Sequence, residues 1–237
     1  MSMDLAERNM IALANNPYPG RGIVIGLSET RRRMIQVYWI MGRSSNSRNR
    51  VFKKENGRLF TEPADPTKVE NPELIFYNAM IEERSKHFIV SNGHQTDAVA
   101  RNLDGTKNLS ETLDGWSFEP DAPNWTPRIT GLFTTYRWPE YQLSILRRSS
   151  NGEVESLLYT YDGLPGLGHG ITTYSGDGNP LPSFQGEPIL LPLCGSAEEI
   201  LDSYWQSLNK DNRVSLAVKT IDMSGESEIE ITNANPL

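Results

Sequence analysis

The side chains best suited to binding chemistry are densest in one basic segment, residues 42–50 (GRSSNSRNR). It places three arginines within eight positions, interleaved with serines and asparagines. Guanidinium groups bind phosphate oxygens bidentately, and hydroxyls and free turn amides satisfy the remaining lone pairs. A charge run can equally be a solvated loop. Because the segment directly follows an apolar stretch, we predict phosphate binding by Arg43, Ser44, Arg48 and Arg50.

Three further polar clusters flank apolar stretches. Tyr77 and Asn78 lie within the apolar run 74–81, and SNGHQTD (91–97) joins a strand end to a helix start, where amides face a ligand. The third cluster, FEPDAPNWTPRI (118–129), holds two carboxylates near an arginine, which suits acid–base chemistry. Each cluster has a plainer interpretation: a core tyrosine, an ordinary turn with a helix cap, and surface acids.

The sequence lacks the motifs of several common nucleotide-binding, catalytic and metal sites. The sequence has no GxxxxGK[ST] phosphate loop and no GxSxG nucleophile elbow. Its one cysteine, Cys194, excludes an internal disulfide and a zinc site built from paired thiolates. In the apolar context LLPLCGS we expect Cys194 to be buried, with a nucleophilic role as the lesser alternative. The three histidines are scattered, so we expect no metal site.

Charge is distributed unevenly along the 237 residues. The net charge is −7, yet residues 1–60 carry 11 basic against 4 acidic side chains. An acidic protein with one basic segment is poorly suited to gripping nucleic acid and better suited to holding one small anion. No stretch approaches the roughly 20 apolar residues of a membrane span, and the N-terminus lacks the apolar run of a secretory signal. We therefore expect a cytoplasmic protein that binds a phosphate-bearing small molecule.

Apolar patterning predicts many strands and few helices. Helical spacing indicates helices at 3–15, 98–102 and 200–208, the last opened by a capping box of Ser196 and Glu199. The aperiodic stretch 104–128 is expected to be a loop. The stretch 163–178 is glycine-dense, and no strand is predicted in it. We predict one α+β domain over 1–237, with helices covering an antiparallel sheet or sheet pair. Strands are predicted at 22–27, 34–41, 59–61, 74–81, 87–91, 129–136, 142–147, 157–161, 214–221 and 228–231.

Six motifs in order resemble one family. They are Arg21-Gly22, GRSSNSRNR, NPELIFYNAM, SNGHQTD, FEPDAPNWTPRI and TTYSGDGNPLPSF, which together run from about Tyr18 to Gly186. In this order they are similar to the archaeal-type inosine monophosphate (IMP) cyclohydrolases, which close the purine ring in the last step of purine synthesis. The sequence departs from the short archaeal form by an N-terminal extension, residues 1–20, and by a longer C-terminal half. These departures bear on oligomer contacts more than on chemistry.

The resemblance implies a fold like that of the N-terminal-nucleophile hydrolases, a four-layer α-β-β-α sandwich with mostly antiparallel sheets. The implied reaction converts 5-formamidoimidazole-4-carboxamide ribonucleotide to IMP with loss of water. It needs no metal, no cofactor and no protein nucleophile. The implied partner is a purine nucleotide, and a homo-oligomer is possible. Two alternatives remain: a non-catalytic sensor of purine nucleotides on the same fold, and an amidohydrolase with a processed N-terminus.

The catalytic inventory expected under this resemblance is a tyrosine, a carboxylate, an arginine and an amide. Tyr77 and Glu119 are the principal candidates, and Arg128 and Asn92 support them. Phe118 and Pro120, which flank Glu119, would favour its neutral form. The expected substrate and phosphate ligands are Arg21, Arg43, Ser44, Arg48, Arg50, Asn78, Asp97, Asn124 and Thr126.

Overall fold

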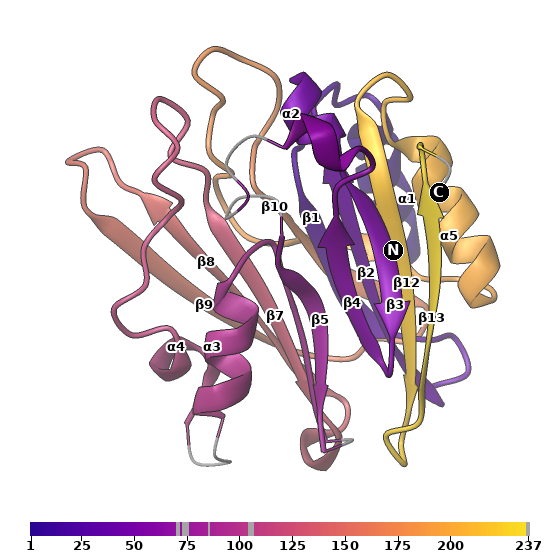
Figure 1. Cartoon of the computed structure of the whole chain (residues 1–237). Coiled ribbons are helices and arrows are strands. Elements are labelled where there is room, and N and C mark those ends of the chain that lie inside the picture. Colours follow the sequence, from indigo (N-terminus) through magenta and orange to yellow (C-terminus); the bar gives the residue numbers. More distant parts are fainter. Residues whose placement is uncertain (70–71, 73–75, 85, 104–106, 236–237) are drawn as a thin grey trace.

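Two antiparallel sheets face each other in the computed structural model, which describes residues 1–69, 72, 76–84, 86–103 and 107–235 (Figure 1). The first sheet contains, in spatial order, β11 (Ile189–Pro192), β10 (Leu167–Thr172), β1 (Gly22–Leu27), β2 (Arg33–Met41), β12 (Arg213–Asp222) and β13 (Ser227–Asn233). The second contains β3 (Val51–Glu55), β4 (Arg58–Glu62), β5 (Asn78–Glu83), β6 (His87–Ser91), β7 (Arg128–Thr134), β8 (Glu140–Arg148) and β9 (Val154–Asp162).

The central strands are apolar on both faces because both faces are covered. In β1, Ile23 and Ile25 belong to the core between the two sheets, whereas Val24 faces the helices. All six residues of β1 are buried, which explains its continuous apolar run in place of a polar–apolar alternation. The same holds for β2, where only Arg33 is exposed.

Helices cover each sheet on the side away from its partner sheet (Figure 1). Helices α1 (Ser2–Ala14) and α5 (Ala197–Ser207) pack on the first sheet, and α3 (Gln95–Asn102) and α4 (Leu109–Thr112) pack on the second. The Ser196–Glu199 capping box opens α5 as predicted. Short helices α2 (Ser45–Arg48), η1 (Pro66–Lys68) and η3 (Thr135–Arg137) lie in connections. The predicted α+β class with antiparallel sheets is therefore confirmed, whereas kinship with the N-terminal-nucleophile hydrolases and the single-domain boundary stay predictions.

No strand was predicted in the glycine-dense stretch 163–178, but it contains β10. A Cβ on Gly168 would lie 2.7 Å from the Ile25 carbonyl oxygen and 2.7 Å from Leu193 Cδ1. Glycine is needed here because neighbouring strands approach the backbone closely. Patterning also missed β3 and β11.

Two further sequence predictions need correction. Of the predicted strand 74–81, residues 74–75 lie outside the described residues, and β5 begins only at Asn78, so Tyr77 precedes the strand. Cys194 is exposed, not buried. Leu193 points into the core beside α5, and in extended chain the next side chain points to the opposite side, outward.

Within the described part of the chain, no helix is both long enough and apolar enough to cross a bilayer. The same residues contain no cluster of three or more histidine, cysteine or acidic side chains placed to hold a metal ion.

Candidate active site

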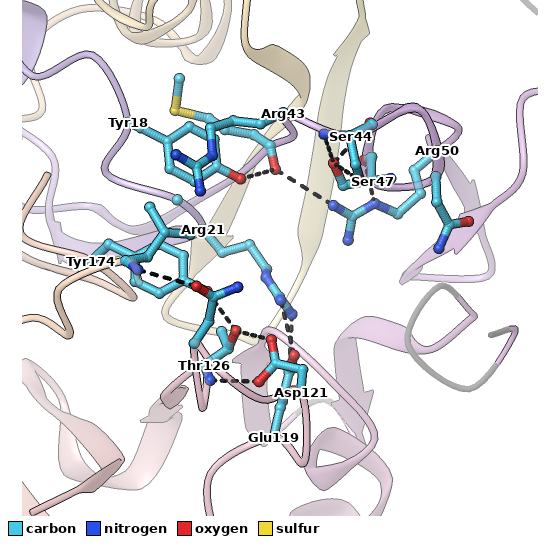
Figure 2. A pocket seen from close by; sticks show the side chains of 15 residues that line it. Tyr18, Arg21, Arg43, Ser44, Ser47, Arg50, Glu119, Asp121, Thr126 and Tyr174 are labelled. Carbon is cyan, nitrogen blue, oxygen red and sulfur yellow. Dashed lines mark hydrogen bonds and ion pairs between the residues drawn. The ribbon is translucent and has the colours of Figure 1, made fainter. Parts of the chain in front are cut away.

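A polar pocket of about 290 Å³ opens beside α2, which lies at one end of the two sheets in Figure 1, and Figure 2 shows the side chains that line it. Four segments far apart in the sequence form it: the residues before β1, the end of β2 with α2, the loop before β7, and the loop after β10. Its volume is near the lower end of the range for small-molecule sites. The lining residues are Tyr18, Gly20, Arg21, Met41, Arg43, Ser44, Asn46, Ser47, Arg50, Glu119, Asp121, Asn124, Thr126, Tyr174 and Leu181.

A buried ion pair between Arg21 and Glu119 forms one wall of the pocket (Figure 2). The guanidinium donates from Nη1 to Glu119 Oε1 at 2.7 Å and from Nη2 to Oε2 at 3.0 Å. Nη1 also donates to the carbonyl oxygen of Asn92 at 2.9 Å. Burial opposes the charge of Arg21, but the Glu119 carboxylate holds the pKa of the guanidinium well above its ordinary value. The wall is therefore a fixed, bidentate charge pair.

The basic segment that follows β2 forms another wall. Arg50 is buried, and it donates from Nε to the Ser47 carbonyl oxygen at 2.9 Å. Burial lowers the pKa of Arg50. Arg43 is more exposed: it pairs with Asp177, and its guanidinium lies 5.0 Å from the centre of the Tyr18 ring. The pocket thus has one buried and one accessible arginine in this segment.

A chain of three hydrogen-bonded side chains completes the pocket. The Thr126 amide donates to Asp121 Oδ1 at 2.7 Å, and the Thr126 hydroxyl bonds to Asp121 Oδ2 and to the Tyr174 hydroxyl. Burial raises the pKa of Asp121, although the two bonds from Thr126 oppose that rise. Burial also raises the pKa of Tyr174, which therefore keeps its proton at neutral pH.

A family model described as IMP cyclohydrolase-like protein matches residues 18–226, which include every residue that lines the pocket. The chain belongs to the IMP cyclohydrolase-like family. No curated protein matches the sequence significantly. Membership in this family indicates an enzyme with a small-molecule nucleotide substrate.

Seven of the residues predicted for an IMP cyclohydrolase-like site line this pocket. They are Arg21, Arg43, Ser44, Arg50, Glu119, Asn124 and Thr126. They come from three separate stretches of the sequence, and the fold brings them together. The semi-apolar setting expected for Glu119 was wrong, because its carboxylate faces Arg21.

Tyr77, the other principal candidate, is buried and does not line the pocket. Its hydroxyl lies 2.7 Å from the hydroxyl of Tyr38. Burial raises the pKa of Tyr38 well above its ordinary value, and Arg21 and Arg50 are close enough to oppose that rise. Tyr77 therefore belongs to a hydroxyl pair close to two of the pocket's arginines, Arg21 and Arg50.

Asn92 and Arg128 also lie off the pocket lining. The Asn92 side chain accepts from the Ile129 amide at 2.9 Å and donates to the Pro127 carbonyl oxygen at 2.9 Å, so it fastens the end of β6 to β7. Arg128 donates to the Ser117 carbonyl oxygen at 3.0 Å, and burial lowers its pKa. Both residues brace the loop that carries Glu119.

Arg48, Asn78 and Asp97 do not line the pocket either. Arg48 turns back to donate to the Gly42 carbonyl oxygen at 3.0 Å, which closes the turn around α2. Asn78 donates to Asp97 at 2.8 Å, which joins β5 to α3. These three side chains bond to other parts of the fold and do not face the pocket.

Tyr18, Ser47, Asp121 and Tyr174 line the pocket but were not among the predicted site residues. Asp121 lies in the same motif as Glu119, so its position two residues further on was a usable signal. Tyr18 and Tyr174 stack with ring centres 6.0 Å apart although 155 positions of sequence lie between them. No local pattern predicts such a contact.

Proposed function

We propose that this protein closes the purine ring of 5-formamidoimidazole-4-carboxamide ribonucleotide to give IMP and water, the last step of purine synthesis. The proposal is supported by family membership and by one observation. The Arg21–Glu119 pair lines the same pocket as Arg43 and Arg50. We further propose that the two sheets and their helices are a variant of the N-terminal-nucleophile hydrolase fold.

The basic segment is the proposed phosphate end of the pocket. Arg43 and Arg50 supply the positive charge, and Ser44 and Ser47 supply hydroxyls beside them. A phosphate dianion is a stronger partner for a guanidinium than one exposed carboxylate, so it would compete with Asp177 for Arg43. The ribose and base would then extend toward the Arg21–Glu119 wall.

Ring closure forms one C–N bond and replaces the formyl C=O bond by a C=N bond to the former formamido nitrogen. The carboxamide nitrogen attacks the formyl carbon, and the formyl oxygen leaves as water after the nitrogens have given up two protons to it. Both reacting groups belong to one molecule, so the enzyme must hold the rotamer that brings them together. It must also remove a proton from nitrogen and supply one to oxygen. These needs are met by side chains alone, without a metal or cofactor.

Glu119 is the proposed base for the carboxamide proton, and Arg21 is proposed to fix its orientation. The bidentate contact fixes the position of the Glu119 carboxyl group, whose oxygens are the proposed acceptors of the carboxamide proton. Tyr77 is proposed to act beside it, since its hydroxyl is buried next to Arg21 and Arg50. Asn92 and Arg128 are proposed to keep the Glu119 loop in place through their contacts.

The test is to mix the purified protein with the formylated nucleotide and to follow IMP formation by absorbance and chromatography. We expect turnover that survives prolonged dialysis against a strong chelator. Tight binding of IMP with no turnover would instead assign the protein to the sensor class. Intact mass of the same sample tests the remaining alternative, since a processed N-terminus would lower it.

A further inference from the structure

Two carboxylic acids lie two positions apart on the loop before β7, in unlike electrostatic settings. Glu119 is paired bidentately with Arg21. Asp121 has no ion pair among the described residues, and its hydrogen bonds come from Thr126. Both carboxyl groups line the same pocket (Figure 2). A pair of carboxyl groups in unlike environments is how enzymes divide the roles of base and acid.

We propose that Asp121 is the general acid of ring closure and that Thr126 and Tyr174 are its positioning residues. The inference rests on the proposed function. When the carboxamide nitrogen attacks, the C–N bond forms and the C=O π bond becomes a C–O⁻ bond. Asp121 gives its proton to that oxygen, while Glu119 takes the proton from nitrogen. The C–O bond then breaks as the former formamido nitrogen loses its proton to the Asp121 carboxylate and its N–H electron pair becomes the π bond of C=N. Protonated Glu119 gives its proton to the departing hydroxyl, which leaves as water, so both side chains return to their starting states.

The groups that face Asp121 set the direction in which its pKa is shifted. Burial raises its pKa and the negative charge of Glu119 raises it further, whereas the bonds from Thr126 and the charge of Arg21 lower it. Arg128 is the other charged group close enough to interact with Asp121. Bound substrate displaces water from the pocket, and this desolvation favours the neutral acid further.

The hydroxyl chain directs the acidic proton toward the pocket. Tyr174 retains its proton, because burial raises its pKa, and it can donate that proton to the Thr126 oxygen. Thr126 then gives its single hydroxyl proton to Asp121 Oδ2. Two protons cannot lie between the same two oxygens, so the proton of neutral Asp121 must point elsewhere. Because Asp121 lines the pocket, the pocket is where that proton points.

The first experiment compares Asp121→Asn with the wild type at saturating substrate. We expect kcat to fall by roughly 10²–10⁴, the usual worth of a positioned proton-transfer group, with IMP affinity changed by less than about threefold. Full kcat in Asp121→Asn beside normal wild-type turnover would overturn the acid role alone. No turnover by the wild type would overturn the proposed function and the acid role with it.

A second set of variants keeps the proposal testable if Asp121→Asn does not fold. An acid must be protonated, so kcat falls as pH rises through the pKa of Asp121. Thr126→Val removes a donor to the carboxylate, so that fall should move to higher pH by up to about one unit. Thr126→Ser keeps the hydroxyl and should restore the wild-type profile, and Tyr174→Phe should give a smaller shift than Thr126→Val. A pH profile that is identical in folded Thr126→Val and wild type would contradict the proposal.

Discussion

Two buried ion pairs lie toward opposite ends of the molecule, and they differ in what else surrounds them. Arg21–Glu119 lines the pocket beside α2, and Figure 1 shows α2 at its upper end. Lys219–Glu82 has an N–O distance of 3.1 Å. Lys219 lies near the end of β12, and the turn between β12 and β13 is at the lower end of Figure 1. Lys219 is 1% exposed, and it also donates to the Gly57 carbonyl oxygen at 3.0 Å and lies over the Phe88 ring.

The difference shows that burial of an ion pair does not by itself mark a functional site. Burial lowers the pKa of Lys219, with Glu82 opposing that effect, because the ammonium group is enclosed between the sheets. The pKa of Arg21 is instead raised, since a bidentate carboxylate compensates its burial. Glu82 borders an open hollow at the surface, but Lys219 does not. We therefore propose that the first pair serves chemistry and that the second holds β12 against β5 and the turn between β3 and β4.

The largest expected effect is on turnover by Glu119→Gln. The amide cannot accept the carboxamide proton, so kcat should fall by roughly 10²–10⁴ while IMP affinity changes little. Glu82→Gln is the matched control, because it makes the same chemical change in the other pair. Steady-state kinetics and IMP titration on both variants test the assignment. Normal kcat in Glu119→Gln would remove this residue from the mechanism.

Tyr77→Phe tests whether a buried residue behind the pocket lining takes part in catalysis. We expect a loss in kcat of roughly 10²–10⁴ if its hydroxyl serves proton transfer, with IMP affinity nearly unchanged. Tyr38→Phe removes the other hydroxyl of the same pair and is the control for a packing effect. A lower melting temperature with nearly normal kcat in Tyr77→Phe would make it a core residue only.

Glu82→Gln should lower the stability of the protein and leave its turnover unchanged. Removing one partner leaves the Lys219 ammonium buried without its counter-charge, and such changes cost about 3–5 kcal/mol. For a chain of this length we expect Tm to fall by about 10 °C, with kcat unchanged. The double variant Glu82→Gln/Lys219→Met removes the buried charge and should recover most of the loss. Differential scanning calorimetry measures Tm for the single and the double variant. An unchanged Tm in Glu82→Gln would show that the Lys219–Glu82 pair is not structural.

The smallest expected effect is a loss of IMP affinity when an arginine at the proposed phosphate end of the pocket is replaced. Arg50→Ala and Arg43→Ala should each weaken IMP binding by about 1.5–3 kcal/mol, as for a hydrogen bond to a charged group. Arg48→Ala is the control in the same segment, because its side chain turns away from the pocket. Calorimetric titration with IMP measures the three affinities. Equal affinity in all variants and the wild type would place the phosphate elsewhere.

Local pattern alone predicted much of the architecture. The limits of β1 and β6, the position of α1 and the capping box of α5 follow from contacts within a few residues. The family motifs likewise indicated that Arg21, Arg50 and Glu119 belong to one site. Strand β10 escaped prediction because glycines were needed where adjacent strands approach closely, which no periodicity reveals.

Only the tertiary structure decided which of these side chains meet. Arg21 and Glu119 are 98 positions apart, and their pairing depends on how the loop before β7 packs against the residues before β1. Arg48 and Arg50 are chemically alike and two positions apart, yet Arg50 lines the pocket and Arg48 closes a turn. The sequence determines which residue types are present and which local secondary structure they form. The meeting of distant loops depends on the packing of two whole sheets, because burial in that shared core fixes where each loop lies.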